Sequence, residues 1–292
     1  METLKNKIDF TLIFEVKNAN PNGDPMFGNR PRVNYEEFGE VSDVCLKRKI
    51  RNRLMQMGED IYVVSQDDSE DFDSLKARFD AFDKQEGVSK KVSKVETFRE
   101  AYSQICNKWL DVRTFGQVFA FGNFSLGVRG AMSIQSAFSI DKVEINSIQI
   151  TKSVNSESKK GTGKDSSTMG MKHRIDYAVY RTNGSINTHF AEKNGLNEDD
   201  VAKIKEAIKT IFENDVSSAR PEGSMRVVGL IWWIHDSFAG NIASYNLYDS
   251  VQVVKKDGVY TPSKLGDYSL CLGEDSQPSG VTREIVINEF DK

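Results

Sequence analysis

The chain has 292 residues, of which 38% are hydrophobic and 10% aromatic, and a formal net charge of -4 at pH 7. This length and composition are typical of a globular protein with a sizeable core, and they argue against a protein that coats nucleic acid indiscriminately. The densest apolar run, residues 230–234, is too short to span a bilayer, the first residues lack an apolar signal core, and the three cysteines lie far apart. We therefore expect a cytoplasmic protein with no membrane segment, metal or cofactor.

The chain begins with a predicted strand and a loop. In residues 9–16 apolar side chains recur at every second position, which indicates a half-buried strand. Residues 18–25 read Asn-Ala-Asn-Pro-Asn-Gly-Asp-Pro, a composition typical of turns. Asp24 is a lone acid in this loop, and we expect it to brace a turn.

A basic helix is predicted to begin after Ser42, which stands where an N-cap belongs. At about 100° per residue, four apolar side chains fall on one face, Leu46, Ile50, Leu54 and Met57. Lys47, Arg48 and Arg51 form a basic stripe beside that face. A capped helix start flanked by Lys and Arg favours phosphate binding, and the alternative is the solvated face of an ordinary amphipathic helix.

The remaining elements alternate between helices and strands. Helical periodicity occurs at residues 71–82, 95–110 and 198–214, and extended patterns at 117–121, 128–134, 143–151, 175–180 and 226–234. The last 55 residues or so are expected to be strand-poor and rich in loops. Without an insertion at 59–110 and an excursion at 149–174, the order is β-α-β-β-α-β, the ferredoxin-like arrangement shared with RNA-recognition folds. The sequence therefore predicts an α+β fold.

The excursion is unusual because residues 155–168 contain no aliphatic or aromatic side chain. A segment of this kind cannot fold alone, yet it lies between two extended stretches. We expect it to form the tip of a long projecting hairpin, and the alternative is a surface loop without function. Six basic residues lie along it, Lys152, Lys159, Lys160, Lys164, Lys172 and Arg174.

Residues 113–120 partly match the signature strand of an RNA-recognition motif. Gln117 and Ala120 occupy positions where that motif has aromatic side chains, so we do not expect a base-stacking sheet surface. Arg113 and Arg129 are candidate phosphate contacts, and the alternative for each is a surface salt bridge.

Signals for catalysis are few. His173 lies between two basic residues with Tyr177 nearby, a group that can in principle support metal-free RNA cleavage by acid–base chemistry. His189 and His235 have no carboxylate or cysteine at metal-ligand spacing, and we expect both to be structural. The chain has no phosphate-binding glycine-rich loop, nucleophile elbow or paired-carboxylate motif. The sequence therefore predicts a protein that is not an enzyme.

Five segments occur in an order that resembles one family. They are Asn-Pro-Asn-Gly-Asp-Pro at 20–25, Ser-Asp-Val-Cys-Leu-Lys-Arg-Lys-Ile-Arg at 42–51, Asp-Val-Arg-Thr-Phe-Gly at 111–116, Val-Arg-Gly-Ala-Met-Ser-Ile-Gln at 128–135 and Thr-Met-Gly-Met-Lys-His-Arg at 168–174. Together they resemble the backbone subunit of the CRISPR Cascade surveillance complex, of the RAMP superfamily, and most closely that of subtype I-C. The likeness runs from about residue 8 to residue 236. Ala131 and Lys142 stand where the family pattern has proline, and Met171 where it has a basic residue.

The resemblance implies a hand-like architecture in which each part has a separate stretch of sequence. It implies a ferredoxin-like palm (1–58, 111–148 and 175–236), a helical finger insertion (59–110), a long β-hairpin thumb (149–174) and a C-terminal extension packed on the palm (237–292). It also implies that copies of the chain polymerise along CRISPR RNA with other Cascade subunits. The guide RNA is then presented for pairing with target DNA in antiviral defence, so that base pairing supplies the specificity.

Residue patterns and resemblance together predict an RNA-binding set in which Lys47 and Arg51 lead. The set is Asn22, Ser42, Lys47, Arg48, Arg51, Arg113, Arg129, Gln135, Lys152, Met169, Lys172, His173 and Arg174. Three alternatives stay open. The chain is a guide-processing endoribonuclease that uses His173 and Tyr177, a nuclease that cuts target RNA through Asp24, or a plain single-stranded RNA-binding module that does not assemble.

Overall fold

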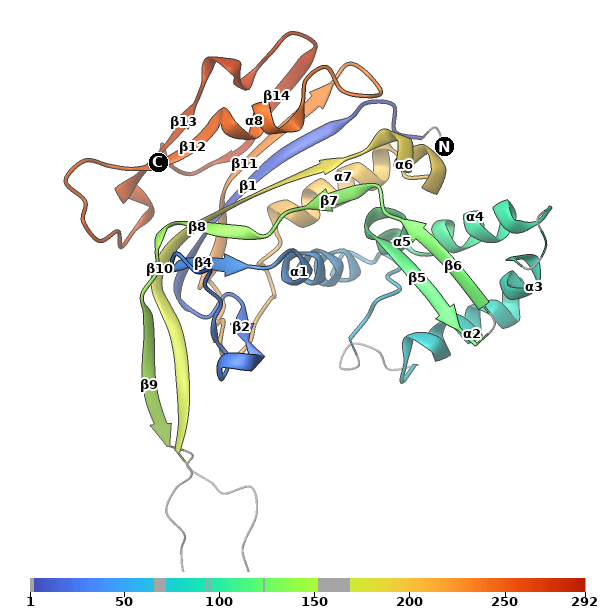
Figure 1. The fold of residues 1–292 in the computed structure, drawn as a ribbon, viewed down its shortest axis with the longest axis horizontal. Coiled ribbons are helices and arrows are strands. Elements are labelled where there is room, and N and C mark those ends of the chain that lie inside the picture. Colours follow the sequence, from blue (N-terminus) through green and yellow to red (C-terminus); the bar gives the residue numbers. More distant parts are fainter. Residues whose placement is uncertain are drawn as a thin grey trace, which may run out of the picture.

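Figure 1 shows the computed structural model of the chain, which describes residues 3–65, 72–92, 94, 96–122, 124–151 and 169–291. A large antiparallel sheet has the strand order β14-β11-β1-β10-β8-β4, and β7 and β9 also pair with β10. Its strands are β1 (Ile8–Ala19), β4 (Phe38–Val41), β7 (Met132–Ile134), β8 (Ala137–Lys142), β9 (Ile145–Thr151), β10 (Met169–Ile186), β11 (Met225–His235) and β14 (Val281–Asn288). The fold is therefore of mixed α and β structure around one sheet.

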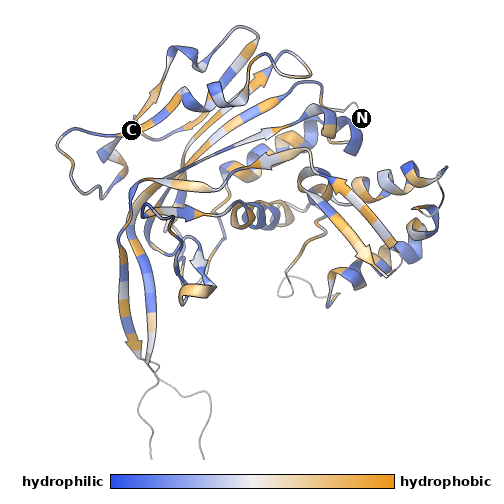
Figure 2. Ribbon diagram, in the orientation of Figure 1, coloured by the Kyte–Doolittle hydropathy of each residue, from blue (hydrophilic) through white to orange (hydrophobic). Residues whose placement is uncertain are grey.

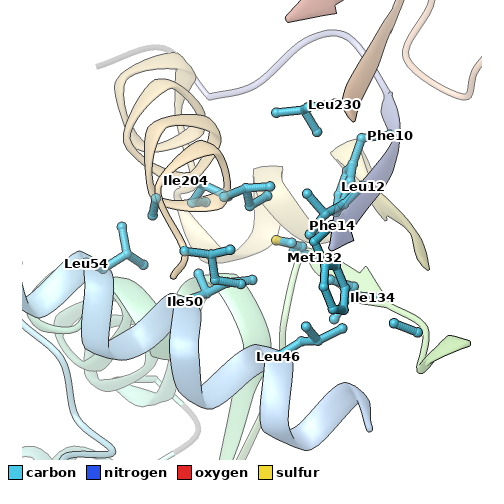
Figure 3. Packing of buried hydrophobic residues seen from close by; sticks show 14 of the residues in the cluster. Phe10, Leu12, Phe14, Leu46, Ile50, Leu54, Met132, Ile134, Ile204 and Leu230 are labelled. Carbon is cyan, nitrogen blue, oxygen red and sulfur yellow. The ribbon is translucent and has the colours of Figure 1, made fainter. Parts of the chain in front are cut away.

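Two helices cover one face of this sheet, α1 (Asp43–Gln56) and α7 (Glu198–Lys209). Leu46 and Ile50 of α1 point towards Phe14 of β1, as Figure 3 shows. These side chains are fully buried in the largest hydrophobic cluster, and Phe14 stacks on Tyr180 of β10 with ring centroids 5.3 Å apart. The predicted strand at 9–16 and the predicted helix after Ser42 are both confirmed.

The opposite face of the sheet is covered by the C-terminal residues, so β1 is buried on both sides. Ile13 of β1 and Trp233 of β11 belong to a second hydrophobic cluster with Leu247 and Tyr268. This region contains α8 (Ser244–Asp249), β12 (Val251–Lys255), β13 (Tyr268–Leu272) and two short 3-10 helices, η3 (Leu265–Asp267) and η4 (Glu274–Ser276). The expectation that the last 55 residues are strand-poor is wrong, because β12 pairs with β13 and β14 extends the main sheet.

A separate cluster is built around the insertion. Its helices and strands are α2 (Leu75–Glu86), α3 (Val88–Val92), α4 (Phe98–Lys108), α5 (Leu110–Phe115), β5 (Gly116–Phe121) and β6 (Phe124–Arg129). Phe119 and Leu126 of the β5–β6 hairpin pack with Tyr62, Phe79 and Trp109 of the insertion. This packing differs from the predicted division at residue 110, because the hairpin lies with the insertion helices rather than in the main sheet (Figure 1).

Strands β9 and β10 project from the sheet as a long hairpin (Figure 1). Their pairing runs from Ile145 opposite Ile175 to Thr151 opposite Met169. The second half of β10 lies inside the main sheet beside β1, which anchors the hairpin. The predicted hairpin tip at 155–168 and Lys152 lie outside the described residues.

A small hairpin of two-residue strands, β2 (Gly23–Asp24) and β3 (Arg30–Pro31), carries a short 3-10 helix, η1 (Pro25–Phe27). It precedes β4 and α1, and a last helix, α6 (Thr188–Asn194), precedes α7. None of the helices in the described ranges is long and apolar enough to cross a membrane.

Candidate nucleic-acid interface

The start of α1 is capped as predicted. Ser42 Oγ accepts a hydrogen bond from the backbone N–H of Cys45 at 3.3 Å. The Ser42 backbone N–H and hydroxyl both donate to Asn22 Oδ1, each at 3.0 Å. Asn22 therefore ties the loop after β1 to the helix start, where backbone N–H groups and the positive end of the helix dipole favour an anion.

Lys47 lies one turn further along α1 on the surface. Its ammonium forms an ion pair with Asp43 Oδ2 at 2.8 Å, and the two side chains are 27% and 37% exposed. Exposed pairs of this kind contribute only about 0–1 kcal/mol. A phosphate can therefore take the place of Asp43 without disturbing the fold.

Arg51, the other leading candidate, is engaged inside the protein. Its Nε donates to Asp111 Oδ2 at 2.9 Å, and the guanidinium lies 4.8 Å from the ring centroid of Phe115. Asp111 is fully buried and also accepts hydrogen bonds from the backbone N–H groups of Tyr62 and Val63 at 2.7 and 3.1 Å. Arg51 thus joins α1 to α5 and to the start of the insertion.

Arg113 is engaged in the same way. It donates through Nε and Nη2 to the two carboxylate oxygens of Asp200 at 2.8 and 2.7 Å, and through Nη1 to the carbonyl of Cys106 at 3.1 Å. The side chains of Arg113 and Asp200 are only 13% and 4% exposed. The salt-bridge alternative therefore holds for Arg113, but the pair is buried and bidentate rather than on the surface.

Arg48 and Gln135 make contacts within the protein. Arg48 Nη1 donates to the carbonyl of Val63 at 2.7 Å, which links α1 to the insertion. Gln135 is exposed after β7, and its Oε1 accepts a hydrogen bond from the Asn183 amide at 3.3 Å. Both side chains lie within reach of the surface, and neither position is excluded as a polar contact to RNA.

Arg129 is exposed at the end of β6. Within the described ranges its side chain forms no ion pair. It borders an open hollow of about 590 Å³ whose lining includes Phe115, Val118 and Phe190. The position offers a free cation beside apolar surface.

The hairpin carries the last three candidates on neighbouring positions of β10. Lys172 is exposed, Arg174 Nε lies 3.1 Å from Asp176 Oδ1, and His173 Nδ1 lies 2.8 Å from Ser147 Oγ. Met169 pairs with Thr151 at the far end of the hairpin, and nothing of its side chain is described.

These contacts divide the predicted cations into two groups. Arg51 and Arg113 pair with buried carboxylates, whereas four cations lie at the surface with exposed partners or with none in the part of the chain that the structure describes. The surface cations are Lys47, Arg129, Lys172 and Arg174. The accessible positive charge therefore follows α1, the finger hairpin and the projecting hairpin.

The acid–base pair suggested for cleavage is not brought together. His173 and Tyr177 lie on the same face of β10 but four residues apart, which is about 13 Å along a strand. The Tyr177 hydroxyl donates to Glu15 Oε2 at 2.7 Å, and burial together with this carboxylate raises the pKa of Tyr177. The phenol is thus held protonated and pointed away from a reaction at His173.

Asp24 braces a turn, as expected. Its Oδ1 accepts a hydrogen bond from the backbone N–H of Met26 at 3.0 Å, and Oδ2 lies 3.3 Å from Arg32 Nη1. His235 is buried and structural, with Nε2 2.8 Å from Asp9 Oδ2 and Nδ1 accepting from the Asn241 N–H at 2.9 Å. The described residues contain no group of three or more His, Cys, Asp or Glu that could hold a metal ion.

The carboxylates Asp111 and Asp200 were missed by sequence reasoning, although each has a local signal. Asp111 stands among Trp109, Leu110 and Val112, where a charge needs a partner. Asp200 follows Asn197 at the spacing of a capping box, and the structure contains that box. Neither signal identifies which arginine the carboxylate binds.

Comparisons with known proteins point in one direction. The model of one protein family, described as CRISPR-associated protein Cas7, matches residues 6–273. A relative from Haloferax volcanii, named CRISPR-associated protein Cas7, is 25% identical over 236 residues, which cover 74% of this chain and 67% of the relative.

Two solved structures contain similar chains. One, from a CRISPR RNA-guided surveillance complex, pre-nicking, has a TM-score of 0.50 and 15% identity, with 87% of this chain and 84% of that chain covered. The other, from a CRISPR RNA-guided surveillance complex, has a TM-score of 0.47 and 15% identity, with 87% and 78% covered. The first of these chains shares the overall fold described above.

Proposed function

This chain belongs to the CRISPR-associated Cas7 family, and on that premise we propose that it is a guide-RNA-binding backbone subunit of a Cascade surveillance complex. Copies of the chain polymerise along one CRISPR RNA together with other Cascade subunits. They hold the guide backbone and leave its bases to pair with target DNA, so that pairing supplies the specificity. The observation that carries this proposal is the family match over residues 6–273.

The fold supports an assignment of the parts of a hand. We assign a ferredoxin-like palm to β11, β1, β10 and β8 with α1 and α7, because these elements follow the chain order strand–helix–strand–strand–helix–strand. The finger insertion extends from residue 59 to Arg129, since the β5–β6 hairpin packs in its core. The β9–β10 hairpin is the thumb, and residues 237–292 form an extension that covers the back of the palm.

The accessible cations support contact with the guide backbone. Lys47, Arg129, Lys172 and Arg174 are each positioned to meet phosphates, and Asn22 and Ser42 present the helix start beside them. Phosphate contacts position a nucleic acid without reading its sequence, which suits a subunit that must accept any guide. Arg51 and Arg113 support the same surface indirectly by joining α1, α5 and α7.

The protein is proposed to be non-catalytic. The separation of His173 from Tyr177 and the use of Asp24 in a turn disfavour the two nuclease alternatives. Assignment to subtype I-C stays a prediction from the sequence motifs. A location in the cytoplasm likewise stays a prediction.

Purification from cells that express a matching CRISPR array tests the proposal. We expect an oligomer of helical appearance in electron micrographs, with RNA of uniform length inside. A combined Lys47→Ala, Arg129→Ala and Lys172→Ala variant should yield folded protein with little RNA, whereas Lys256→Ala, an exposed lysine in the C-terminal extension, should behave like the parent.

A strictly monomeric and RNA-free preparation of the parent protein would contradict the proposal. A preparation that binds RNA but never assembles would instead favour a plain single-stranded RNA-binding module.

A further inference from the structure

The loop between β2 and β3 exposes two large apolar side chains at its tip. Met26 is 86% exposed and Phe27 is 71% exposed, and both belong to η1. Figure 2 shows η1 as a hydrophobic spot at the end of this small hairpin. The pair contributes nothing to the hydrophobic clusters of the described residues. Large apolar side chains that protrude together in this way mark a contact surface more often than a single exposed leucine does.

The tip is built as an ordered turn. Asp24 caps η1 through the Met26 N–H and pairs with Arg32, and its carbonyl accepts a hydrogen bond from the Asn29 N–H at 2.8 Å. The Asn20 amide donates to the Asn29 carbonyl at 2.7 Å. Gly28 ends η1 at a φ of 64°, in the left-handed region that favours glycine. Met26 and Phe27 are therefore held outward by a hydrogen-bonded frame.

The charge around the tip is suited to an anionic partner. Between Pro25 and Tyr35 the chain carries Arg30 and Arg32 and no carboxylate. Arg32 is partly neutralised by Asp24, whereas Arg30 is exposed, and no ion pair of its side chain occurs in the described parts of the chain. Glu36, the nearest acid beyond this stretch, lies on the other side of Tyr35 in the sequence.

The same hairpin is tied to the helix start that we propose as a phosphate site. Asn22, one residue before β2, accepts both hydrogen bonds from Ser42, and the Arg32 N–H donates to the Asn22 carbonyl at 3.0 Å. A strand of RNA whose phosphate meets the start of α1 thus passes beside the hairpin. This relationship favours the guide strand over any other partner.

We propose that Met26 and Phe27 form an apolar wedge that stacks against a base of the bound guide RNA, while Arg30 contacts a neighbouring phosphate. The inference rests on the proposed function. Apolar side chains of this kind separate adjacent bases, and aromatic side chains stack on bases of any identity. The wedge therefore holds one guide base in each copy of the chain without selecting its sequence.

Fluorescent bases test the wedge. The full-length chain is assembled on synthetic guides that carry 2-aminopurine at one position at a time, across the length covered by one copy. In the parent protein we expect one position to be markedly brighter than its neighbours, because the wedge separates that base from the adjacent base. The double variant Met26→Ala and Phe27→Ala should lose at least half of this enhancement, and Tyr260→Ala, a control with a 93% exposed aromatic side chain, should retain it.

The outcomes separate the wedge from the proposed function. Failure of the parent protein to assemble on RNA would overturn both. Normal assembly of the double variant with an unchanged fluorescence profile would overturn the wedge alone. An enhancement that arises only after target DNA is added would assign the tip to the target strand, and a double variant that binds short RNA normally but no longer oligomerises would assign it to contacts between copies. Either result would overturn the guide-base proposal.

Arg30→Ala provides an independent measurement on the same assembly. Loss of one phosphate contact to a single strand reduces the slope of log K against log salt concentration by about 0.7. Circular dichroism and thermal unfolding should match the parent for all three tip variants, since the substituted side chains are exposed. An unchanged salt slope would remove Arg30 from the proposal.

Discussion

Arg51 and Asp111 form an ion pair with 2.9 Å between Nε and Oδ2, and the carboxylate is completely buried. The pair joins the helix that follows the first strand to the helix that leads out of the insertion. Lys47, four residues earlier on α1, instead pairs with an exposed aspartate. One basic helix thus serves two purposes, with Arg51 directed into the fold and Lys47 available to a ligand.

Replacement of Arg51 by alanine should destabilise the protein. The change leaves Asp111 buried without its cationic partner, and breaking a buried pair in this way costs about 3–5 kcal/mol. Urea unfolding followed by circular dichroism measures the free energy of unfolding. Lys47→Ala is the matched control on the same helix and should change this free energy by less than about 1 kcal/mol. Equal stability of the two variants would show that Arg51 is not the structural residue of the pair.

The surface cations should determine the salt dependence of RNA binding. Each phosphate contact to a single strand contributes about 0.7 to the slope of log K against log salt concentration. Lys47→Ala combined with Lys172→Ala should therefore reduce the slope by about 1.4, and by the same amount for RNAs of different sequence. Titrations at several salt concentrations, with Lys256→Ala as the control, measure this. Loss of affinity for one sequence only would contradict backbone recognition.

The sequence was informative where local patterns decide the structure. Alternation of apolar residues predicted β1, and the position of Ser42 predicted the cap of α1. The roles of Arg51 and Arg113 were not predictable, because their carboxylate partners lie 60 and 87 residues away in the sequence and only the fold brings them together. A basic residue on a predicted helix therefore has to be paired in three dimensions before it is assigned to a ligand.

The C-terminal strands were missed for a related reason. Strands β12 and β13 are five residues each and are separated by a stretch rich in Gly, Pro, Ser and Asp, which obscures their alternation. Strand β14 is recognisable only through its pairing with β11. Pairing between distant segments is tertiary information that a local pattern does not contain.

Substitution of His173 should have no effect on RNA cleavage. Its ring contacts Ser147, and the Tyr177 hydroxyl is held by Glu15, so the two groups cannot act on one phosphate. Repeat RNA incubated without metal should stay intact with the parent protein, with His173→Ala and with Tyr177→Phe. Cleavage by the parent that disappears in His173→Ala would instead establish the endoribonuclease.

Asp9 should make the stability of the fold depend on pH in the acid range. Burial raises the pKa of the Asp9 carboxyl, but hydrogen bonds from His235 and Lys7 and the charge of Lys7 outweigh it, so the pKa is lowered from its ordinary value of 3.8. Above 3.8 the carboxylate is charged in both states and its full contribution is present. As the pH falls below 3.8, the unfolded state binds a proton that the folded state does not, and this contribution is lost until the pH passes the lowered pKa.

Asp9→Asn tests this dependence. The variant should be less stable than the parent near neutral pH, and the difference should shrink as the pH falls from about 5 towards 2. Urea unfolding at stepped pH values measures it, and Asp257→Asn, at an exposed position, should follow the parent throughout. A difference between Asp9→Asn and the parent that does not vary with pH would mean that the pKa of Asp9 is not lowered by folding.

The start of α1 allows a cap to be separated from a phosphate site. Ser42→Ala removes the hydrogen bond to the Cys45 N–H and should cost about 1 kcal/mol of stability. Ser42→Asp keeps a side chain that caps helices well and adds a negative charge at the positive end of the dipole, so the fold should be retained. If a guide phosphate lies there, the added charge repels it, and the RNA affinity of Ser42→Asp should fall several-fold at low salt and recover relative to the parent as salt is raised. Ser42→Thr, which keeps the hydroxyl, should bind RNA like the parent, and equal affinities of the Thr and Asp variants at low salt would show that no phosphate lies at this helix start.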